Sequence, residues 1–150
     1  MVTITPMTDE ALVDWAPRLW RDYHADLIRA GYSQTSADDN VARNRDSTMP
    51  EGRLAPGQYV FDIRSEGSIV GNAWLAESNS EWFVYNLEII ESARGRGLGR
   101  EALIAIEDFV RSRGGTVLSL SVFGFNEVAQ RLYVSQGFAT VQMSMTKWLD

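Results

Sequence analysis

The run Arg94-Gly95-Arg96-Gly97-Leu98-Gly99 combines three glycines with two arginines. It follows an apolar stretch and precedes an amphipathic one, so it falls where a predicted strand meets a predicted helix. Glycine lets backbone N–H groups turn toward a ligand without a Cβ in the way, and the first turn of a helix adds unpaired N–H groups. With the positive charges of Arg94, Arg96 and Arg100, the run predicts a phosphate-binding site. The alternative is a tight turn that only connects the two elements.

The run matches neither of the two common phosphate loops. It lacks the GxxxxGK[ST] spacing, and it lacks GxGxxG with an acidic residue about twenty positions later. A nucleoside triphosphatase or a nicotinamide-dependent enzyme is therefore not expected. The run does fit Arg/Gln-x-x-Gly-x-Gly through Arg94, Gly97 and Gly99. About thirty residues later, residues 126–138 fit Asn-x-x-Ala-x-x-Leu-Tyr-x-x-x-Gly-Phe.

These two motifs, in this order and separation, resemble those of the GCN5-related N-acetyltransferase (GNAT) superfamily. The resemblance is strongest over residues 83–138, and it implies an enzyme that moves an acetyl group from acetyl-CoA to an amine. It implies acetyl-CoA as cosubstrate and no metal. It places the Ile89 backbone amide near the thioester carbonyl, Asn126 beside the CoA arm, and the CoA pyrophosphate on the backbone amides of the glycine-rich run. The implied binding residues are Ile89, Arg94, Gly95, Arg96, Gly97, Leu98, Gly99, Arg100 and Asn126.

Tyr133 is the tyrosine of the second motif. The resemblance implies that its hydroxyl meets the charge that develops on the CoA sulfur, although a half-buried aromatic residue on a helix can equally be a core residue. Asn126 can likewise be only a helix N-cap. Ser121 stands where certain relatives place a glutamate, so no base is expected there.

Glu88 is a charged residue inside the apolar strand predicted around residues 83–89. A carboxylate in such a place needs a partner or a purpose. Glu88 is therefore predicted to be a catalytic base, an amine ligand or a member of a structural ion pair. Strand alternation predicts that it faces away from Tyr85, Leu87 and Ile89.

The identity of the acceptor amine is left open by the sequence. The resemblance implies that residues 20–45 and 81–85 form the acceptor wall, where aromatic and acidic side chains would suit a cationic amine but are also normal on a solvated surface. His24 is expected to be a partly exposed helix residue or a substrate contact. Small-molecule amines, aminoglycosides, polyamines, amino acids and protein N-termini all remain possible acceptors. The wall residues are Trp20, Tyr23, Tyr32, Asp38, Asp39 and Glu81.

Composition limits the remaining possibilities. A chain of 150 residues with 45% hydrophobic content fits one acetyltransferase domain over residues 1–150. The net charge of −6 argues against nucleic-acid partners. Without cysteine, no protein thiol can carry the acetyl group, so direct attack in a ternary complex is expected. The single histidine makes a zinc site improbable.

No apolar run reaches eighteen residues, and the N-terminus does not read as a signal peptide. We therefore expect a cytoplasmic protein without a membrane partner, as a monomer or homodimer. Two other classes of function stay open. One is an acyl-CoA-binding module without turnover, and the other is an interaction domain whose glycine run binds a generic anion.

Periodicity and capping signals predict a mixed α/β fold. The resemblance implies a GNAT-like arrangement, with a mostly antiparallel twisted sheet of about six to seven strands flanked by about four helices. Strands are predicted over residues 2–5, 58–65, 68–76, 82–90, 116–122 and 138–147. Helices are predicted over residues 9–30, 36–46, 98–113 and 127–136.

Overall fold

A computed structural model describes residues 1–149. The first helix, α1 (Asp9–Arg29), begins where the Thr8 side chain accepts a hydrogen bond from the Ala11 amide, and the chain turns after it at Gly31 with φ +107°. The second helix, α2 (Gln34–Thr48), begins before the predicted residue 36. Its cap is Ser33, whose hydroxyl accepts from the Ser36 amide at 3.1 Å.

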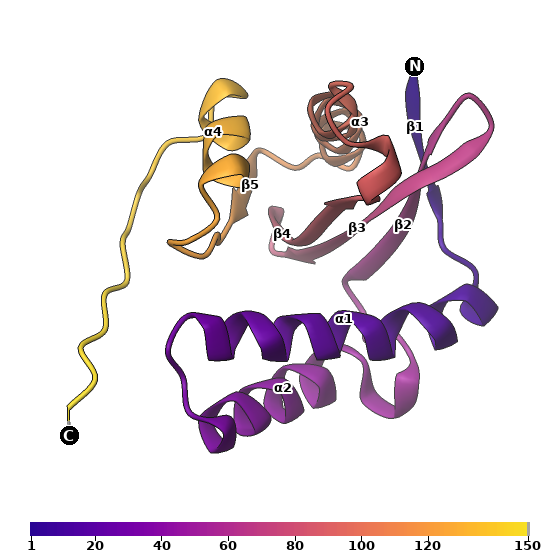
Figure 1. Ribbon diagram of the computed structural model, residues 1–150. Helices are drawn as coiled ribbons and strands as arrows, with labels where there is room; N and C mark the ends of the chain where they lie inside the picture. Colours follow the sequence, from indigo (N-terminus) through magenta and orange to yellow (C-terminus); the bar gives the residue numbers. More distant parts are fainter. Residues whose placement is uncertain (150) are drawn as a thin grey trace.

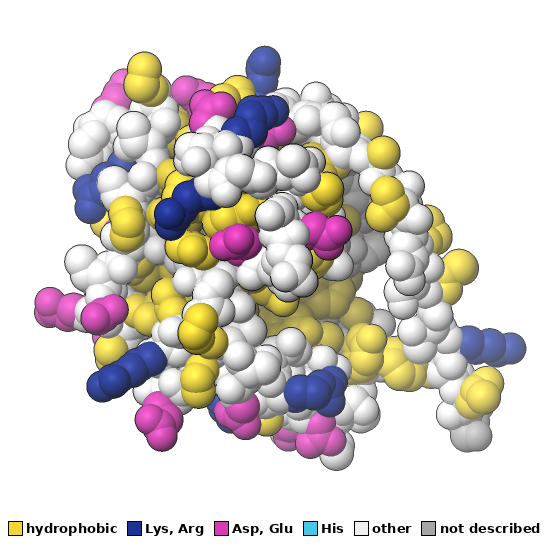
Figure 2. All heavy atoms as spheres, turned by 180° about the vertical axis from the view of Figure 1, so that it is seen from behind, with side chains coloured by type: hydrophobic (Ala, Val, Ile, Leu, Met, Phe, Trp, Pro, Cys, Tyr) yellow, Lys and Arg dark blue, Asp and Glu magenta, His cyan; other side chains and the backbone are white. Residues whose placement is uncertain are grey.

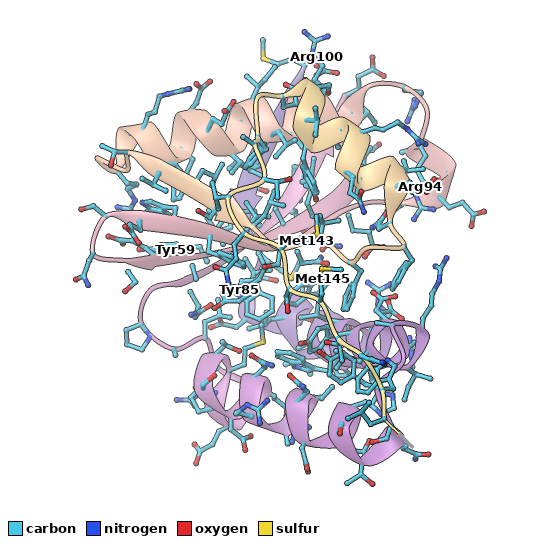
Figure 3. The ribbon with its side chains drawn as sticks, turned by 90° about the vertical axis from the view of Figure 1, so that its left-hand side faces the viewer. Tyr59, Tyr85, Arg94, Arg100, Met143 and Met145 are labelled. Atoms are coloured by element: carbon cyan, nitrogen blue, oxygen red, sulfur yellow. The ribbon has the colours of Figure 1, made fainter. Side chains whose placement is uncertain are left out.

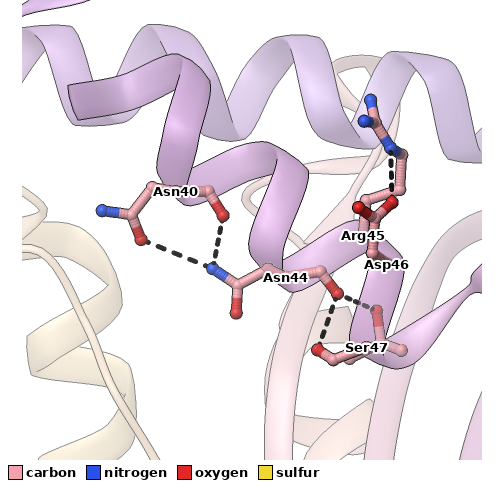
Figure 4. Close-up of polar contacts among 6 residues, drawn as sticks. Asn40, Asn44, Arg45, Asp46 and Ser47 are labelled. Carbon is pink, nitrogen blue, oxygen red and sulfur yellow. Dashed lines mark hydrogen bonds and ion pairs between the residues drawn. The ribbon is translucent and has the colours of Figure 1, made fainter. Parts of the chain in front are cut away.

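The polar side chains of α2 bond mainly to the helix itself. Asn44 donates to the Asn40 carbonyl at 2.9 Å, and its own carbonyl accepts from Ser47 and Thr48 (Figure 4). Asn40 and Asn44 lie inside the helix, so these side-chain bonds add to its backbone ladder and keep the polar side chains close to the helix. Asp38 instead bonds to His24 of α1, and Ala37 and Val41 bury the other side of α2.

Five strands form one sheet in the order β1-β2-β3-β4-β5, and only the β4–β5 pair is parallel. The helices α3 (Leu98–Ser112) and α4 (Glu127–Ser135) lie on one side of the sheet, and α1 and α2 lie on the other (Figure 1). The mixed α/β prediction is confirmed. The strands are β1 (Val2–Pro6), β2 (Gln58–Ser65), β3 (Ser68–Ser78), β4 (Glu81–Ile89) and β5 (Val117–Leu120), and single 3₁₀ turns lie at Pro50–Gly52 and Glu91–Ala93.

The two faces of the sheet have different cores. The face toward α3 is largely aliphatic, with Leu75 and Ile106 fully buried. The face toward α1 and α2 is aromatic, because Trp15 and Trp20 meet Trp74 edge to face with ring centroids 6.4 and 5.6 Å apart. The α3 side also holds aromatic rings, around Trp82 and Phe109, so the two sides differ in their share of aromatic side chains.

The predicted last strand over residues 138–147 is wrong. Residues 139–149, which we call the C-terminal arm, are extended but pair with no strand among the described residues, so the sheet has five strands rather than six to seven. The alternation of apolar and polar residues suits a strand, but a strand also needs an edge to bond to. Trp148 packs on Tyr32 with ring centroids 5.1 Å apart, and this contact holds the arm at the α1–α2 turn.

Candidate active site

The candidate site begins where β4 and β5 separate. The two strands pair only from Glu81 opposite Val117 to Val84 opposite Leu120. On the other side of β4, Trp74 of β3 faces Asn86 and Leu75 faces Val84, so Tyr85 is an extra residue that forms a β-bulge. Beyond this bulge, β4 continues to Ile89, and no strand within residues 1–149 lies beside it on the β5 side.

The exposed edge of β4 offers backbone groups at Ile89. The Ile90 amide donates to the Val70 carbonyl of β3 at 2.8 Å. Because successive residues of a strand point their N–H groups to opposite sides, the Ile89 N–H points to the open edge. The Ile89 carbonyl does not bond to β3. It accepts a hydrogen bond from the Arg94 Nε at 2.9 Å. The structure therefore places the predicted Ile89 amide where an extended ligand could pair with β4.

The glycine-rich run follows directly and is fixed at both ends. Ala93 and Leu98 are buried in the core, while Gly95 and Gly97 between them are exposed with φ of +77° and +75°. Gly97 is the N-cap of α3 and supplies no side-chain cap, so the first amides of the helix stay open. Arg94, Arg96 and Arg100, in the turn and just after it, are also exposed, and Figure 3 labels Arg94 and Arg100. The run thus has the backbone geometry of an anion site.

Helix α4 brings the second motif to this turn. A Cβ added to Gly99 would lie 3.2 Å from Leu132 Cδ2 and 3.9 Å from Ile89 Cγ1, so β4, α3 and α4 converge at Gly99. Tyr133 is the next residue of α4, and its ring packs edge to face on Phe138 at 5.7 Å. Burial raises the pKa of the Tyr133 hydroxyl above its usual value. That hydroxyl is therefore a proton-bearing donor at neutral pH.

Asn126 acts as the N-cap of α4, since its side chain accepts from the Ala129 amide at 3.3 Å. It also lines a cavity of about 420 Å³ between α1 and α4, together with Arg29 and Phe125. The predicted N-cap is thus confirmed, and the contact of Asn126 with the CoA arm stays a prediction.

Glu88 lies half-buried on β4 opposite Asn72, on the side of the sheet that faces α1 and α2. Asn72 is itself buried and accepts from the Asn86 amide at 2.7 Å. No Lys, Arg or His side chain among residues 1–149 forms an ion pair with Glu88. The ion-pair interpretation of Glu88 therefore has no support, and the carboxylate stays available to a ligand.

The predicted orientation of Tyr85 is wrong, although those of Leu87 and Ile89 are right. Leu87 and Ile89 pack on the α3 side of the sheet. Tyr85 lies on the same side as Glu88, because its ring stacks on Trp74 at 4.6 Å. The bulge at Tyr85 shifts the alternation by one residue, and simple alternation does not include such a shift.

The expected acceptor wall is only partly present. Trp20 is buried in the core, and Asp38 is bound to His24 at 2.8 Å, joining α1 to α2. Tyr23 remains half-buried near Phe123, with ring centroids 6.4 Å apart. Tyr32 is half-buried under Trp148, whereas Asp39 and Glu81 are exposed and form no ion pair among the described residues. Tyr23 and Tyr85 thus form the aromatic part of this side.

Sequence reasoning missed the loop before α4. Phe123 and Phe125 stack at 5.2 Å, and the Arg29 guanidinium of α1 lies 4.1 Å from the Phe125 ring centroid. Gln130 fixes this loop by donating to the carbonyls of Phe123 and Gly124, both at 3.1 Å. The spacing of aromatic residues before Asn126 was the only signal, and it does not reveal that α1 would be their partner.

Within residues 1–149, no group of three or more His, Cys, Asp or Glu side chains is placed to hold a metal ion. In the same residues, none of the helices has the length and apolar character needed to cross a membrane.

The separated strands, the glycine-rich turn and the second motif on α4 define an acetyltransferase of the GNAT type. The model of the acetyltransferase (GNAT) family matches residues 11–138. The chain belongs to this family and is an N-acetyltransferase. It is 28% identical to the uncharacterized N-acetyltransferase YycN of Bacillus subtilis (strain 168), over 99% of both chains. It is 33% identical to the N-alpha-acetyltransferase RimI of Mycobacterium tuberculosis, over 58% of this chain and 56% of RimI.

Solved structures agree with this assignment. The crystal structure of YycN superposes with a TM-score of 0.90 over 99% of each chain. The PaiA N-acetyltransferase of Thermoplasma acidophilum, solved in complex with coenzyme A, superposes with a TM-score of 0.67 over 96% of this chain and 93% of that one. At 14% identity, the PaiA comparison shows a shared fold only.

Proposed function

We propose that this protein transfers the acetyl group of acetyl-CoA to a primary amine by direct attack in a ternary complex, as a single domain over residues 1–150. The observation that carries the proposal is the convergence of β4, α3 and α4 at Gly99, beside the unpaired edge of β4. An extended pantetheine arm can pair with that edge while its pyrophosphate meets the open amides of α3. PaiA, which shares this fold, was solved with coenzyme A, and we propose the same ligand class for this chain.

The amine nitrogen must be neutral before it can attack the thioester carbon. A primary amine has a pKa near 10.4, so freeing its lone pair at pH 7 costs roughly 4.6 kcal/mol. Glu88 is a half-buried carboxylate on the α1–α2 side of β4, with no ion-pair partner among the described residues. In the proposal, Glu88 takes this proton directly or through a water molecule, or it binds the ammonium group before deprotonation.

The leaving group is the CoA thiolate. The carbonyl carbon forms its bond to nitrogen, the C–S bond breaks, and the sulfur takes a proton. A thiol has a pKa near 8.5 and a tyrosine near 10, so complete transfer from an ordinary tyrosine is uphill by roughly 2 kcal/mol. Burial raises the pKa of Tyr133 further, which favours a strong hydrogen bond to the thiolate over early proton transfer. Water then completes the protonation.

The acceptor in this proposal is a cationic amine, because Glu88 and Tyr85 face the same side of β4, while Glu81 at the start of β4 and Asp39 on α2 are exposed carboxylates. The names of relatives include an N-alpha-acetyltransferase, a streptothricin acetyltransferase and a mycothiol acetyltransferase. Protein N-termini, aminoglycosides, polyamines, amino acids and other small amines therefore remain the panel to test.

The test is release of free CoA thiol from acetyl-CoA with that panel of amines, with acetyl-CoA binding measured separately by calorimetry. We expect acetyl-CoA to bind and at least one amine to accelerate thiol release. Binding without turnover on every amine would favour the non-catalytic acyl-CoA-binding module. Absence of acetyl-CoA binding would contradict the whole proposal.

A further inference from the structure

A continuous row of aromatic rings, which we call the aromatic row, leads from β4 to the end of α1. Tyr85 begins the row beside Trp74, and Trp20 links Trp74 to Tyr23 at centroid distances of 5.6 and 6.4 Å. The tryptophans are buried, whereas Tyr85 is 47% exposed and lies between the sheet and the helices α1 and α2 in Figure 3. Figure 2 shows that the surface above these helices is hollowed and that its floor is hydrophobic. Apolar surface therefore leads away from Glu88 along α1. The aromatic row consists of Tyr85, Trp74, Trp20, Tyr23, Phe123 and Phe125.

The aromatic row crosses to the loop before α4 and ends at Arg29. Tyr23 lies 6.4 Å from Phe123, which stacks on Phe125 at 5.2 Å. Gln130 holds this loop by donating to the Phe123 carbonyl at 3.1 Å. The Arg29 guanidinium lies 4.1 Å from the Phe125 ring centroid, and such stacking leaves the N–H groups at the edge of the guanidinium plane free for a planar partner. Arg29 is therefore oriented before any ligand binds.

A cavity of about 420 Å³ lies beside Arg29, between the end of α1 and the start of α4 (Figure 1). Arg29 forms no ion pair among residues 1–149, although Asp26 lies one turn before it on α1. Glu127, the other carboxylate of the cavity, lies 4.0 Å from the Arg131 Nη1. Val128 at the start of α4 also lines the cavity, and amides at the start of a helix have no helical partner. An unpaired guanidinium beside a helix N-terminus favours a carboxylate ligand.

The two helices place this cavity at similar distances from the acceptor side and from the proposed chemistry. Arg29 follows Tyr23 by six residues of α1, which is about 9 Å along the helix. Tyr133 follows Asn126, which lines the cavity, by seven residues of α4, which is about 10 Å. One extended residue spans about 3.5 Å, so a free amino acid is too short to join the two places and a peptide of about three residues is long enough.

We propose that the acceptor carries a carboxylate on the order of 10 Å from its amine, and that this carboxylate binds Arg29 in the cavity between α1 and α4. The body of the acceptor lies along the exposed rings of the aromatic row, and its amine lies at Glu88. A short peptide with a free C-terminal carboxylate is the class of molecule that fits. Arg29 binds the carboxylate with two parallel N–H groups, the geometry that the guanidinium fork prefers. The inference rests on the proposed acetyl transfer and narrows its acceptor.

The test compares the tripeptide alanyl-alanyl-phenylalanine with its C-terminal amide, which keeps the amine and the size but lacks the carboxylate. We expect kcat/KM for the acid to exceed that for the amide by about 10-fold, mainly through KM. Arg29→Gln should remove this preference and leave the KM for acetyl-CoA unchanged. Arg21→Gln is the matched control and should keep the preference, because Arg21 is also exposed on α1 but does not line the cavity. Far-UV circular dichroism checks that both variants fold.

Equal kcat/KM for the acid and the amide would overturn the inference and leave the acetyl transfer standing. A preference for the acid that survives Arg29→Gln would also overturn it. If neither peptide is acetylated, calorimetric binding of the two peptides in the presence of CoA decides the matter separately from turnover. Binding of the acid that is lost both in the amide and in Arg29→Gln supports the carboxylate site, and equal binding of acid and amide contradicts it.

Discussion

The two sides of β4 are built in different ways. On the α3 side, Leu87 and Ile89 are aliphatic packing residues, and the groups that face the proposed cofactor are backbone amides at Ile89 and in the turn before α3. On the α1–α2 side, Tyr85 and Glu88 present a ring and a carboxylate. In the proposed function, one side therefore binds its ligand mainly through backbone groups and the other through side chains.

The two sides of β4 also differ in how many segments of the chain build them. The backbone side comes from one continuous segment, residues 89–101, plus a single contact from Leu132. The side-chain side collects Trp74, Tyr23, Phe123 and Arg29 from three distant segments. Substitutions there can change the acceptor without disturbing the turn that we propose binds the phosphate. Variants on each side should therefore fail in different ways.

The largest effect is expected for Gly97→Val. Gly97 has φ +75°, so a branched side chain forces the turn out of the conformation that opens the α3 amides. We expect acetyl-CoA binding to fall below detection in calorimetry, and activity to fall with it. Strain in the left-handed region should also cost about 1–3 kcal/mol of stability.

Gly114→Val is the matched control for Gly97→Val, because Gly114 has φ +79°, lies just beyond the other end of α3 and has no neighbour within 4 Å of an added Cβ. It should lose similar stability and keep its acetyl-CoA affinity. Equal affinities in folded Gly97→Val and Gly114→Val proteins would mean that the glycine-rich run is only a connection.

Tyr133→Phe is the second largest expected effect, and it acts on chemistry rather than binding. The hydroxyl meets charge that appears on sulfur only as the C–S bond breaks, so kcat should fall by about 10²–10⁴ while acetyl-CoA affinity shifts little. Tyr59→Phe is the control, since the Tyr59 ring is half-buried in the core between Trp82 and Phe109. Unchanged single-turnover transfer by Tyr133→Phe would make Tyr133 a packing residue.

The backbone side is also the part of the site that the sequence could predict. The glycines at 95, 97 and 99 and the helical spacing of Ala102, Ile106 and Val110 are local signals, and the structure confirms the turn and the buried face of α3. The strand over residues 58–65 has the predicted bounds for the same reason. Local periodicity is enough where each residue's environment depends on its own element.

The α1–α2 side of β4 could not be predicted from the sequence, because its geometry depends on contacts between residues far apart in the chain. The bulge that turns Tyr85 toward Trp74 arises from the register of β3 against β4. The burial of Trp20 depends on Trp74, and the cavity beside Asn126 depends on α1 reaching α4. The prediction of a strand over residues 138–147 was wrong because the alternation of apolar and polar residues does not indicate which sheet edge a segment would pair with.

Glu88→Gln tests the side-chain side of the comparison, and its effect should depend on pH. If Glu88 removes a proton from the amine, activity at pH 7 should fall by about 10²-fold and recover as the pH approaches the amine pKa near 10.4. Asp62→Asn is the control, because Asp62 is a half-buried carboxylate opposite Asn72 on the neighbouring strand β2. The measurement is the pH profile of kcat/KM. A uniform loss at every pH would exclude proton removal as the role of Glu88.

The smallest effect is expected for Asp26→Asn in the cavity between α1 and α4. There the ionised Asp26 carboxylate lowers the stability of the folded protein. Burial, then the neighbouring Asp22, raises the pKa of the Asp26 carboxyl, and Arg29 opposes this only in part. A raised pKa means that the folded state disfavours the ionised form. The cost is therefore present at neutral pH and disappears below the ordinary carboxyl pKa near 3.9, where both states are protonated.

Asn removes the charge, so Asp26→Asn should be slightly more stable at pH 7, by less than about 0.5 kcal/mol because the group is partly solvated. The gain should vanish near pH 3. Urea unfolding at the two pH values measures it, with the exposed Asp39→Asn on α2 as control. A stability loss at pH 7 would show that the attraction of Arg29 outweighs the burial of Asp26, and that the cavity stabilises a negative charge.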